Sequence, residues 1–159
     1  GIIGEFNIAE NMILDSYYDN RFSSAVTLRW QDVYKATVEN VAAFDVRTPS
    51  IFNLANTLSG GNQQKLVVAR ELSRDVKLIV AAQPTRGLDV GSIEYIHKRI
   101  IEAREKGVGV LIVSTELDEI MALSDRILVM YRGRIVSEFE AGKAEIAKIG
   151  LAMAGAPAA

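Results

Sequence analysis

The chain has 159 residues, the length of one ordinary domain, and its 18 basic and 20 acidic side chains leave a net charge of −2. This balance argues against a protein that holds nucleic acid through phosphate contacts, because such binding needs an excess of basic groups. The chain has no cysteine and a single histidine, which excludes disulfides, thiolate chemistry and a histidine-rich metal site. Hydrophobic residues make up 49% of the chain, enough for a core and for a face that another surface covers.

The N-terminal part is predicted to be helical and irregular. Asn7 and Glu10 have the spacing of a capping box, which opens a short helix through residues 12–14. Residues 19–27 are polar and predict a loop. Residues 30–44 predict a second helix, because apolar side chains recur there at intervals of three and four residues.

The second half of the chain alternates strands and helices. Residues 77–82 form an apolar run of strand length, and a helix is expected over residues 92–106, ended by Gly107. Residues 108–113 predict a second apolar strand, and residues 116–123 predict a short helix.

The end of the chain predicts a β-hairpin and one more helix. Two strand-like runs, 126–131 and 134–139, flank Arg132-Gly133, and a two-residue connection of this kind is typical of a tight turn. Residues 141–159 predict a helix followed by a frayed tail. Helices that alternate with strands apolar on both faces favour an α/β fold with a parallel sheet covered by helices.

Residues 58–71 have the sequence Leu-Ser-Gly-Gly-Asn-Gln-Gln-Lys-Leu-Val-Val-Ala-Arg-Glu, which is the most informative stretch of the chain. A serine and two glycines come just before an amphipathic helix that we expect to reach Ser73. A helix N-terminus leaves backbone N–H groups unpaired and carries partial positive charge, and glycines let a phosphate approach that backbone closely. The pattern predicts either an anion site that includes the Ser59 hydroxyl or an ordinary Ser N-cap with a flexible entry.

Further motifs accompany this stretch in a fixed order. Residues 58–64 and 68–72 resemble the signature loop and helix of ABC-type ATPases. Residues 84–89 (Pro-Thr-Arg-Gly-Leu-Asp) and 113–120 (Val-Ser-Thr-Glu-Leu-Asp-Glu-Ile) are similar to motifs that follow in that family, as are residues 124–129. The resemblance covers nearly the whole chain and is closest to the second ATP-binding half of tandem subunits that drive simple-sugar and nucleoside importers.

The resemblance implies a partial P-loop NTPase core with an added α-helical subdomain. Residues 1–73 would form the helical subdomain with the signature loop, residues 74–140 part of the α/β core, and residues 141–159 a C-terminal helix and frayed tail. The P-loop pattern G-x-x-x-x-G-K-[ST] is absent, since the pair Gly142-Lys143 precedes alanine. In the family the P-loop lies upstream of the helical subdomain, so we expect the chain to be a fragment that begins after it.

Three positions depart from the catalytic pattern of the family. The Asp that helps to hold Mg²⁺, the Glu that polarises water and the switch His match Ala82, Gln83 and Thr115 here. Alanine cannot ligate a cation, and a neutral glutamine is a weak base at best. His97 lies in the middle of a predicted helix and is no substitute. We therefore expect a degenerate Walker B site with no catalytic residue and no metal ligand, and a chain that is inactive by itself.

The signature loop, in contrast, follows the family pattern, with Asn62 in place of the more general Gln. In ABC dimers this loop closes over ATP held by the partner half, so the resemblance implies ATP-binding residues that act in trans: Ser59, Gly60, Gly61, Asn62 and Gln63. Asp89 resembles an aspartate that reaches across the dimer interface, and a helix cap near Gly91-Ser92 is its competing role. ATP and Mg²⁺ are expected in the full assembly, with no cofactor for the chain by itself.

The resemblance also implies partners and a place in the cell. The partners are the other ATP-binding half of the same subunit and the coupling helices of a membrane permease, and the place is the cytoplasmic inner face of the plasma membrane. Trp30, Tyr34 and Phe44 are candidate contacts to the permease, or plain core residues. No nucleic-acid partner is expected. A sheet that lacks a central strand would leave open edges, which favour self-association of the chain.

Three alternatives compete with this interpretation. An enzyme of another class finds no support, because the chain has neither a nucleophile elbow nor a G-x-G-x-x-G motif. A DNA-repair-type ABC ATPase would carry long coiled coils and a basic surface, which are not visible. The third is a folded interaction module that binds no nucleotide of its own. The solute is open between sugars and nucleosides, although Ala81-Ala-Gln-Pro84 is closer to nucleoside-type subunits.

Overall fold

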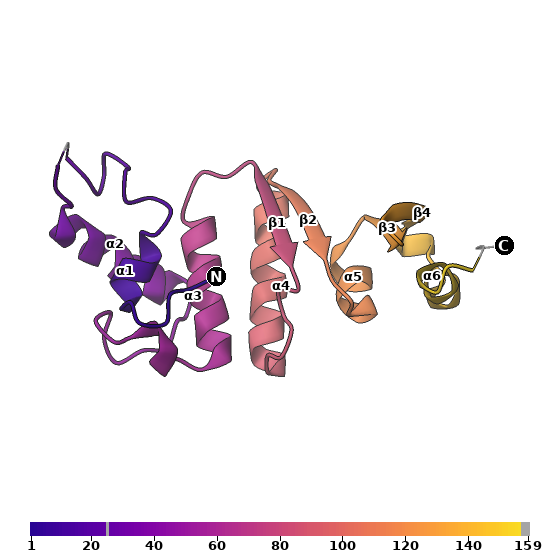
Figure 1. Cartoon of the computed structure of the whole chain (residues 1–159), viewed down its shortest axis with the longest axis horizontal. Coiled ribbons are helices and arrows are strands. Elements are labelled where there is room, and N and C mark those ends of the chain that lie inside the picture. Colours follow the sequence, from indigo (N-terminus) through magenta and orange to yellow (C-terminus); the bar gives the residue numbers. More distant parts are fainter. Residues whose placement is uncertain (25, 157–159) are drawn as a thin grey trace. The chain divides into compact units, whose positions relative to one another are not determined.

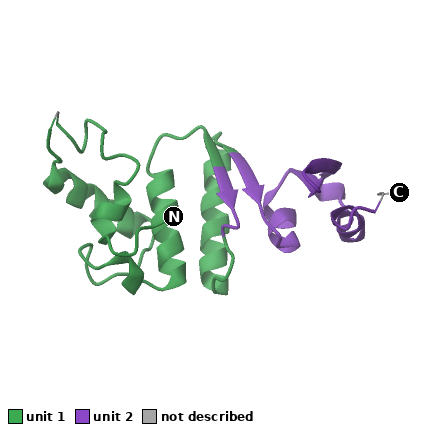
Figure 2. Ribbon diagram, viewed as in Figure 1, with its two compact units in different colours: residues 1–79, 85–109 green, residues 80–84, 110–159 purple. Residues whose placement is uncertain are grey.

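The computed structural model of the protein describes residues 1–24 and 26–156, and Figure 1 shows the order of its helices and strands. The chain divides into two compact units, which Figure 2 colours separately. Unit 1 comprises Gly1–Ile79 and Thr85–Gly109, and unit 2 comprises Val80–Pro84 and Val110–Ala159. The division expected from motif order, into 1–73, 74–140 and 141–159, stays a prediction.

Helix α1 (Ile8–Met12) begins with the expected capping box. Asn7 Oδ1 accepts a hydrogen bond from the Glu10 amide at 2.8 Å, and the Glu10 carboxylate accepts one from the Asn7 amide at 2.7 Å. The helix is confirmed, although it ends at Met12 and is therefore slightly shorter than expected. The described residues of the polar stretch 19–27 form turns and one isolated bridge, without a helix.

Helix α1 is the centre of the helical part of unit 1, between α2 (Trp30–Ala43) and α3 (Gly60–Leu72). Its side chains enter two apolar clusters on different sides. The first cluster joins α1 to α3 and to the 3₁₀ turn η1 (Ala55–Thr57), and contains Ile8, Met12, Val46, Ala55, Leu58, Leu66 and Ala69. The second joins α1 to α2 and contains Ala9, Ile13, Phe22 and Val33. Burial of both sides of α1 gives three short helices a shared core.

Asn11 is fully buried and ties down the segment that precedes α1. Its side-chain oxygen accepts a hydrogen bond from the Ile3 amide at 2.8 Å, and its side-chain nitrogen lies 2.9–3.2 Å from the carbonyl oxygens of Ile3, Phe6 and Asn7. One buried side chain therefore joins residues 3–7 to α1 by four hydrogen bonds, and it supplies the acceptor for the Ile3 amide.

Strands β1 (Leu78–Ala82) and β2 (Gly109–Val113) form a two-stranded sheet. The Gly109 amide donates to the Lys77 carbonyl at 2.9 Å where both strands start, and the Gln83 amide donates to the Val113 carbonyl at 2.7 Å where both end. The two strands therefore run parallel, as Figure 1 shows. Both strands are confirmed, and so is the α/β class with a parallel sheet.

Helix α4 (Val90–Glu105) separates the two strands along the chain, as expected for parallel neighbours. It begins two residues before the predicted start because Asp89 is its N-cap. Lys106 is the C-cap, and the next residue, Gly107, has a φ of +85°, a conformation that glycine adopts without a Cβ clash.

Unit 2 contains a hairpin packed against a helix. The elements are α5 (Leu117–Leu123), β3 (Arg126–Tyr131), β4 (Arg134–Glu140), a 3₁₀ turn η2 (Ala141–Lys143) and α6 (Ile146–Met153). Arg132 and Gly133 both have positive φ angles, of 47° and 77°, as in a type I′ turn, and the predicted tight turn is confirmed. The buried side chains of this part are Ile127, Val129, Ala141, Ile149 and Ala152.

The C-terminal helix is confirmed, whereas most of the predicted frayed tail, residues 157–159, lies outside the described residues. Among the described residues no helix has both the length and the hydropathy that a membrane span requires.

We predict that Asn11→Ala destabilises the protein by about 2–3 kcal/mol, because it removes the four hydrogen bonds of a fully buried side chain and leaves the Ile3 amide without its acceptor. Urea denaturation measures this change in the free energy of unfolding. The control is Asn20→Ala, since Asn20 is exposed and its change should stay within about 0.5 kcal/mol. Equal effects of the two substitutions would show that the Asn11 hydrogen bonds do not hold the N-terminal segment.

Candidate functional site

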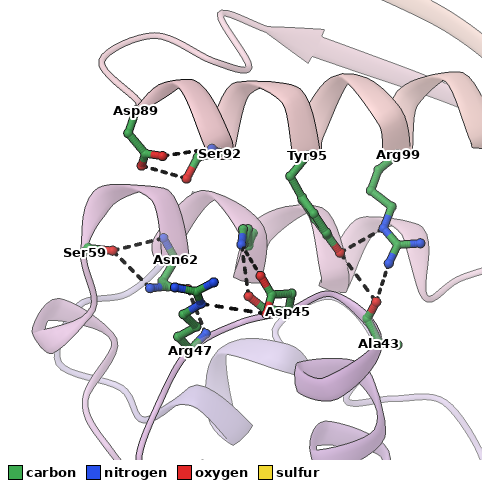
Figure 3. Close-up of polar contacts among 10 residues, drawn as sticks. Ala43, Asp45, Arg47, Ser59, Asn62, Asp89, Ser92, Tyr95 and Arg99 are labelled. Carbon is green, nitrogen blue, oxygen red and sulfur yellow. Dashed lines mark hydrogen bonds and ion pairs between the residues drawn. The ribbon is translucent and has the colours of Figure 1, made fainter.

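Ser59 is the N-cap of α3, and its hydroxyl oxygen accepts two hydrogen bonds from Asn62 (Figure 3). Its Oγ accepts hydrogen bonds from the Asn62 amide at 3.4 Å and from the Asn62 side-chain nitrogen at 3.1 Å. A hydroxyl oxygen has two lone pairs and one proton. Because both acceptor positions are used within the protein, the proton is left to donate outward, which suits an anion.

The two glycines after Ser59 have different surroundings. Gly60 is exposed, and a Cβ built on it would meet nothing within 4 Å. Gly61 is buried, and a Cβ there would lie 2.3 Å from Ser92 Oγ and 3.2 Å from Asp89 Oδ2. Gly60 therefore offers open backbone to a ligand, whereas Gly61 is required for the close approach of α3 to the start of α4. This second reason for a glycine is invisible in the sequence.

Asp89 caps helix α4 with both carboxylate oxygens. Oδ1 accepts from the Ser92 amide at 3.0 Å, and Oδ2 accepts from the Ser92 hydroxyl at 2.8 Å. The hydrogen bond from the Ser92 backbone, followed by that from its side chain, lowers the pKa of Asp89 below its ordinary value. The capping role is therefore present in the structure, and the role at a dimer interface stays a prediction.

A group of charged and aromatic side chains lies beside the first turns of α3 and was not predicted from the sequence (Figure 3). Lys65 is buried, and its Nζ donates to the Asp45 carboxylate at 2.7 Å and to the Asp45 carbonyl at 3.2 Å. The same ammonium lies 4.6 Å from the centroid of the Tyr95 ring, within cation–π range. The hydrogen bond from Lys65 lowers the pKa of Asp45. Asp45 itself has a φ of +49°.

The positive φ of Asp45 closes helix α2 in a Schellman motif. The Val46 amide donates to the Val41 carbonyl at 2.9 Å, and the Asp45 amide donates to the Ala42 carbonyl at 3.3 Å. Glycine is the usual residue at such a position, because a Cβ costs about 1–2 kcal/mol there. An aspartate directly after the helix predicted over residues 30–44 is the one sequence signal that could have pointed to this cluster.

Arg99 of α4 binds the C-terminal end of α2. Its guanidinium donates to the Tyr95 hydroxyl at 2.9 Å and to the Ala43 carbonyl, and it lies 4.8 Å from the centroid of the Phe44 ring. A cation at this end of a helix satisfies carbonyl groups that have no partner within the helix. Phe44, a candidate permease contact, thus packs under Arg99 and against the α1–α3 cluster.

The two other candidate permease contacts, Trp30 and Tyr34, lie in an aromatic cluster with Phe52. The Trp30 and Tyr34 ring centroids are 5.6 Å apart, and those of Tyr34 and Phe52 are 5.0 Å apart. Trp30 is 39% exposed and Phe52 is 56% exposed. Phe52, which sequence reasoning missed, therefore belongs with the two aromatic residues of α2.

The three predicted degenerate positions lie at the carboxyl ends of β1 and β2 in unit 2. Ala82 is the last residue of β1, and Gln83 follows it with a φ of +51°. The Gln83 side-chain oxygen accepts long hydrogen bonds from the Thr115 amide at 3.5 Å and from the Thr115 hydroxyl at 3.4 Å. The parallel topology thus brings Gln83 and Thr115 together, as a neutral pair. His97 lies half-buried in the middle of α4 in unit 1.

Proteins with similar sequences match nearly all of this chain. Guanosine import ATP-binding protein NupO of Bacillus subtilis is 46% identical over 155 residues, which cover 98% of this chain and 30% of that protein. Glucose import ATP-binding protein TsgD13 of Haloferax volcanii is 45% identical over 157 residues, covering 98% and 28%. The chain thus spans less than a third of the length of these relatives. No protein-family model matches it.

Solved structures share the fold at lower sequence identity. A dimeric post-hydrolysis state of the ATP-binding cassette MJ0796 with ADP and phosphate has a TM-score of 0.73 at 24% identity, covering 89% of this chain and 59% of that one. The ADP form of the ATP-binding cassette MJ1267 has a TM-score of 0.68 at 21% identity, covering 96% and 60%.

We predict that Gly61→Ala destabilises the protein by about 1–3 kcal/mol, because its Cβ would displace Ser92 from Asp89. Gly60→Ala is the matched control and should change the free energy of unfolding by no more than about 0.5 kcal/mol, since the space around it is open. Thermal or urea denaturation compares the two variants. A larger loss in Gly60→Ala than in Gly61→Ala would contradict the packing of α3 on α4.

The α/β topology and the comparisons agree: the chain has the fold of ABC ATP-binding cassettes, and its sequence is similar to part of import ATP-binding proteins for guanosine and glucose.

Proposed function

We propose that this chain is part of the ATP-binding subunit of an ABC importer for sugars or nucleosides, and that its Ser59 loop (residues 59–63) binds the ATP held by a partner half. The observation that carries the proposal is the Ser59 hydroxyl, whose two lone pairs are occupied by Asn62 while its proton is free to donate. Phosphate oxygens are acceptors only, so they suit this donor.

The backbone after Ser59 supports the same ligand. Gly60 and Gly61 are the first two residues of the 13-residue helix α3, where amides have no intrahelical acceptor and the helix dipole is positive. The open space at Gly60 lets a phosphate come close to these amides. The residues of the loop therefore fit the phosphate groups of ATP.

At the chain's own catalytic position the matching side chains carry no charge, and we propose that this position does not hydrolyse ATP. Ala82 has no ligand for Mg²⁺, and the side chains of Gln83 and Thr115 are neutral and hydrogen-bonded to each other. These residues do not fit the Mg²⁺ ion that ATP brings. The assembly would then be asymmetric, with one competent site completed by the Ser59 loop and one site that is catalytically silent.

The other proposed partner is a membrane permease, at the inner face of the plasma membrane. The aromatic cluster of Trp30, Tyr34 and Phe52 is the surface that supports this docking, because two of its rings are substantially exposed. Phe44 is assigned to the core instead, since it packs beneath Arg99.

The proposed self-association of the chain through strand edges would involve β1 and β2, which form a sheet of two strands.

We predict that Ser59→Ala in the intact transporter lowers ATPase turnover by roughly 10- to 100-fold, the usual worth of one hydrogen bond to a charged group. Ser59→Asp should also lower turnover, since it keeps a helix cap and removes the donor. The control is Ser73→Ala, the same change at the other end of α3. Steady-state phosphate release measures all three variants, and unchanged turnover in Ser59→Ala would refute the proposal.

Restoring the two acidic residues of the silent site should by itself add little. We predict that Ala82→Asp with Gln83→Glu leaves turnover of the intact transporter nearly unchanged, because Thr115 still lacks an imidazole. Adding Thr115→His in a triple variant tests whether the third position is the missing group. A large gain from the double variant would contradict the assignment of three separate defects.

A further inference from the structure

We propose that Asp45 is a positioning residue for the Ser59 loop, acting through Lys65, Arg47 and Asn62. This inference rests on the proposed phosphate-binding role of Ser59. It goes beyond that role because Asp45 lies outside the loop, in the turn that follows α2, and no motif of the sequence includes it.

The turn of residues 44–47 is attached to α3 at two points. Lys65 of α3 holds the Asp45 carboxylate at 2.7 Å and the Asp45 carbonyl at 3.2 Å. Two residues later, the Arg47 amide donates to Asn62 Oδ1 of α3 at 2.8 Å. The ion pair between Lys65 and Asp45 therefore holds the turn in a position from which the Arg47 amide reaches the Asn62 side chain.

The orientation of the Asn62 side chain in turn determines one of its hydrogen bonds to Ser59. An Asn side chain carries one oxygen and one NH₂ group on a planar amide, so fixing the oxygen also fixes the direction of the nitrogen. In this structure the oxygen is bound to the Arg47 amide, and the nitrogen donates to Ser59 Oγ at 3.1 Å. That second bond occupies a lone pair of Ser59 and leaves its proton free to donate to a ligand.

The cation in this chain of contacts has little freedom. Lys65 is buried, with the Tyr95 ring 4.6 Å from its ammonium and the Asp45 carboxylate beside it. Tyr95 is in turn held by Arg99, which also binds the Ala43 carbonyl at the end of α2. The residues Tyr95 and Arg99 of α4 thus lie against Ala43 at the end of α2, just before Asp45 (Figure 3).

The backbone at Asp45 separates positioning from stability. Its φ of +49° lies in the region that favours glycine, so a protein that needed only the turn would be served best by glycine there. The carboxylate is therefore the feature that distinguishes aspartate at this position. Asp45→Gly removes the carboxylate and keeps, or eases, the backbone conformation.

The test compares Asp45→Gly with Ser59→Ala and the double variant in the intact transporter. We expect Asp45→Gly to stay folded, with the loss of the carboxylate beside the buried Lys65 partly offset by relief of the positive φ, while ATPase turnover falls roughly tenfold. We expect the double variant to be no slower than Ser59→Ala, because both changes act on the same hydroxyl. Asp75→Gly, which removes an exposed carboxylate elsewhere in unit 1, should leave turnover unchanged.

A second measurement follows the contact itself. Hydrogen exchange of the Arg47 amide should become faster in Asp45→Gly and in Lys65→Met, and should stay slow in Lys65→Arg, which keeps the cation. Turnover should follow the same order.

The outcomes separate the two proposals. Turnover that falls in Ser59→Ala but stays at the wild-type level in Asp45→Gly overturns the positioning role and leaves the proposed function standing. Unchanged exchange of the Arg47 amide in Asp45→Gly also overturns the positioning role. Unchanged turnover in Ser59→Ala overturns the proposed function and this inference with it.

Discussion

The contact between the first turns of α3 and α4 is the constraint on which the geometry of the Ser59 loop depends. Gly61 faces Ser92 and Asp89 at distances that leave no room for a side chain, so the two helix starts can meet only at a glycine. Asp89 and Ser92 are themselves held by two hydrogen bonds at the start of α4. The start of α3, where Ser59 and Gly60 precede Gly61, is therefore held next to the start of α4.

Charge organises the same region at its other side. The C-terminal end of α2 has carbonyl groups without intrahelical partners and a negative partial charge, and Arg99 and Tyr95 of α4 bind it. Lys65 of α3 binds the acidic residue that follows. The negative end of one helix is thus satisfied inside the protein, whereas the positive end of α3 at Ser59 and Gly60 is exposed to a ligand. This difference supports the proposed binding of an anion at the loop.

The carboxyl ends of β1 and β2 show a parallel topology that brings neutral side chains together. Parallel strands bring the residues that follow them to one edge, and Gln83 and Thr115 indeed lie in contact there. Their side chains are neutral, and Ala82 has no polar atom to offer. The fold brings these positions to one edge of the sheet, but the side chains determine whether they can ligate a metal ion or transfer a proton.

The sequence by itself determined the elements of this protein, since the capping box at Asn7, the cap at Ser59 and the turn at Arg132-Gly133 depend on residues within a few positions of one another. The order of its motifs also determined the resemblance to ABC ATPases. Only the tertiary structure decided why residue 61 is a glycine, and that Asp45 meets Lys65, 20 residues further along the chain. Close approach and ion pairing depend on how helices pack, and packing joins residues that local patterns cannot relate.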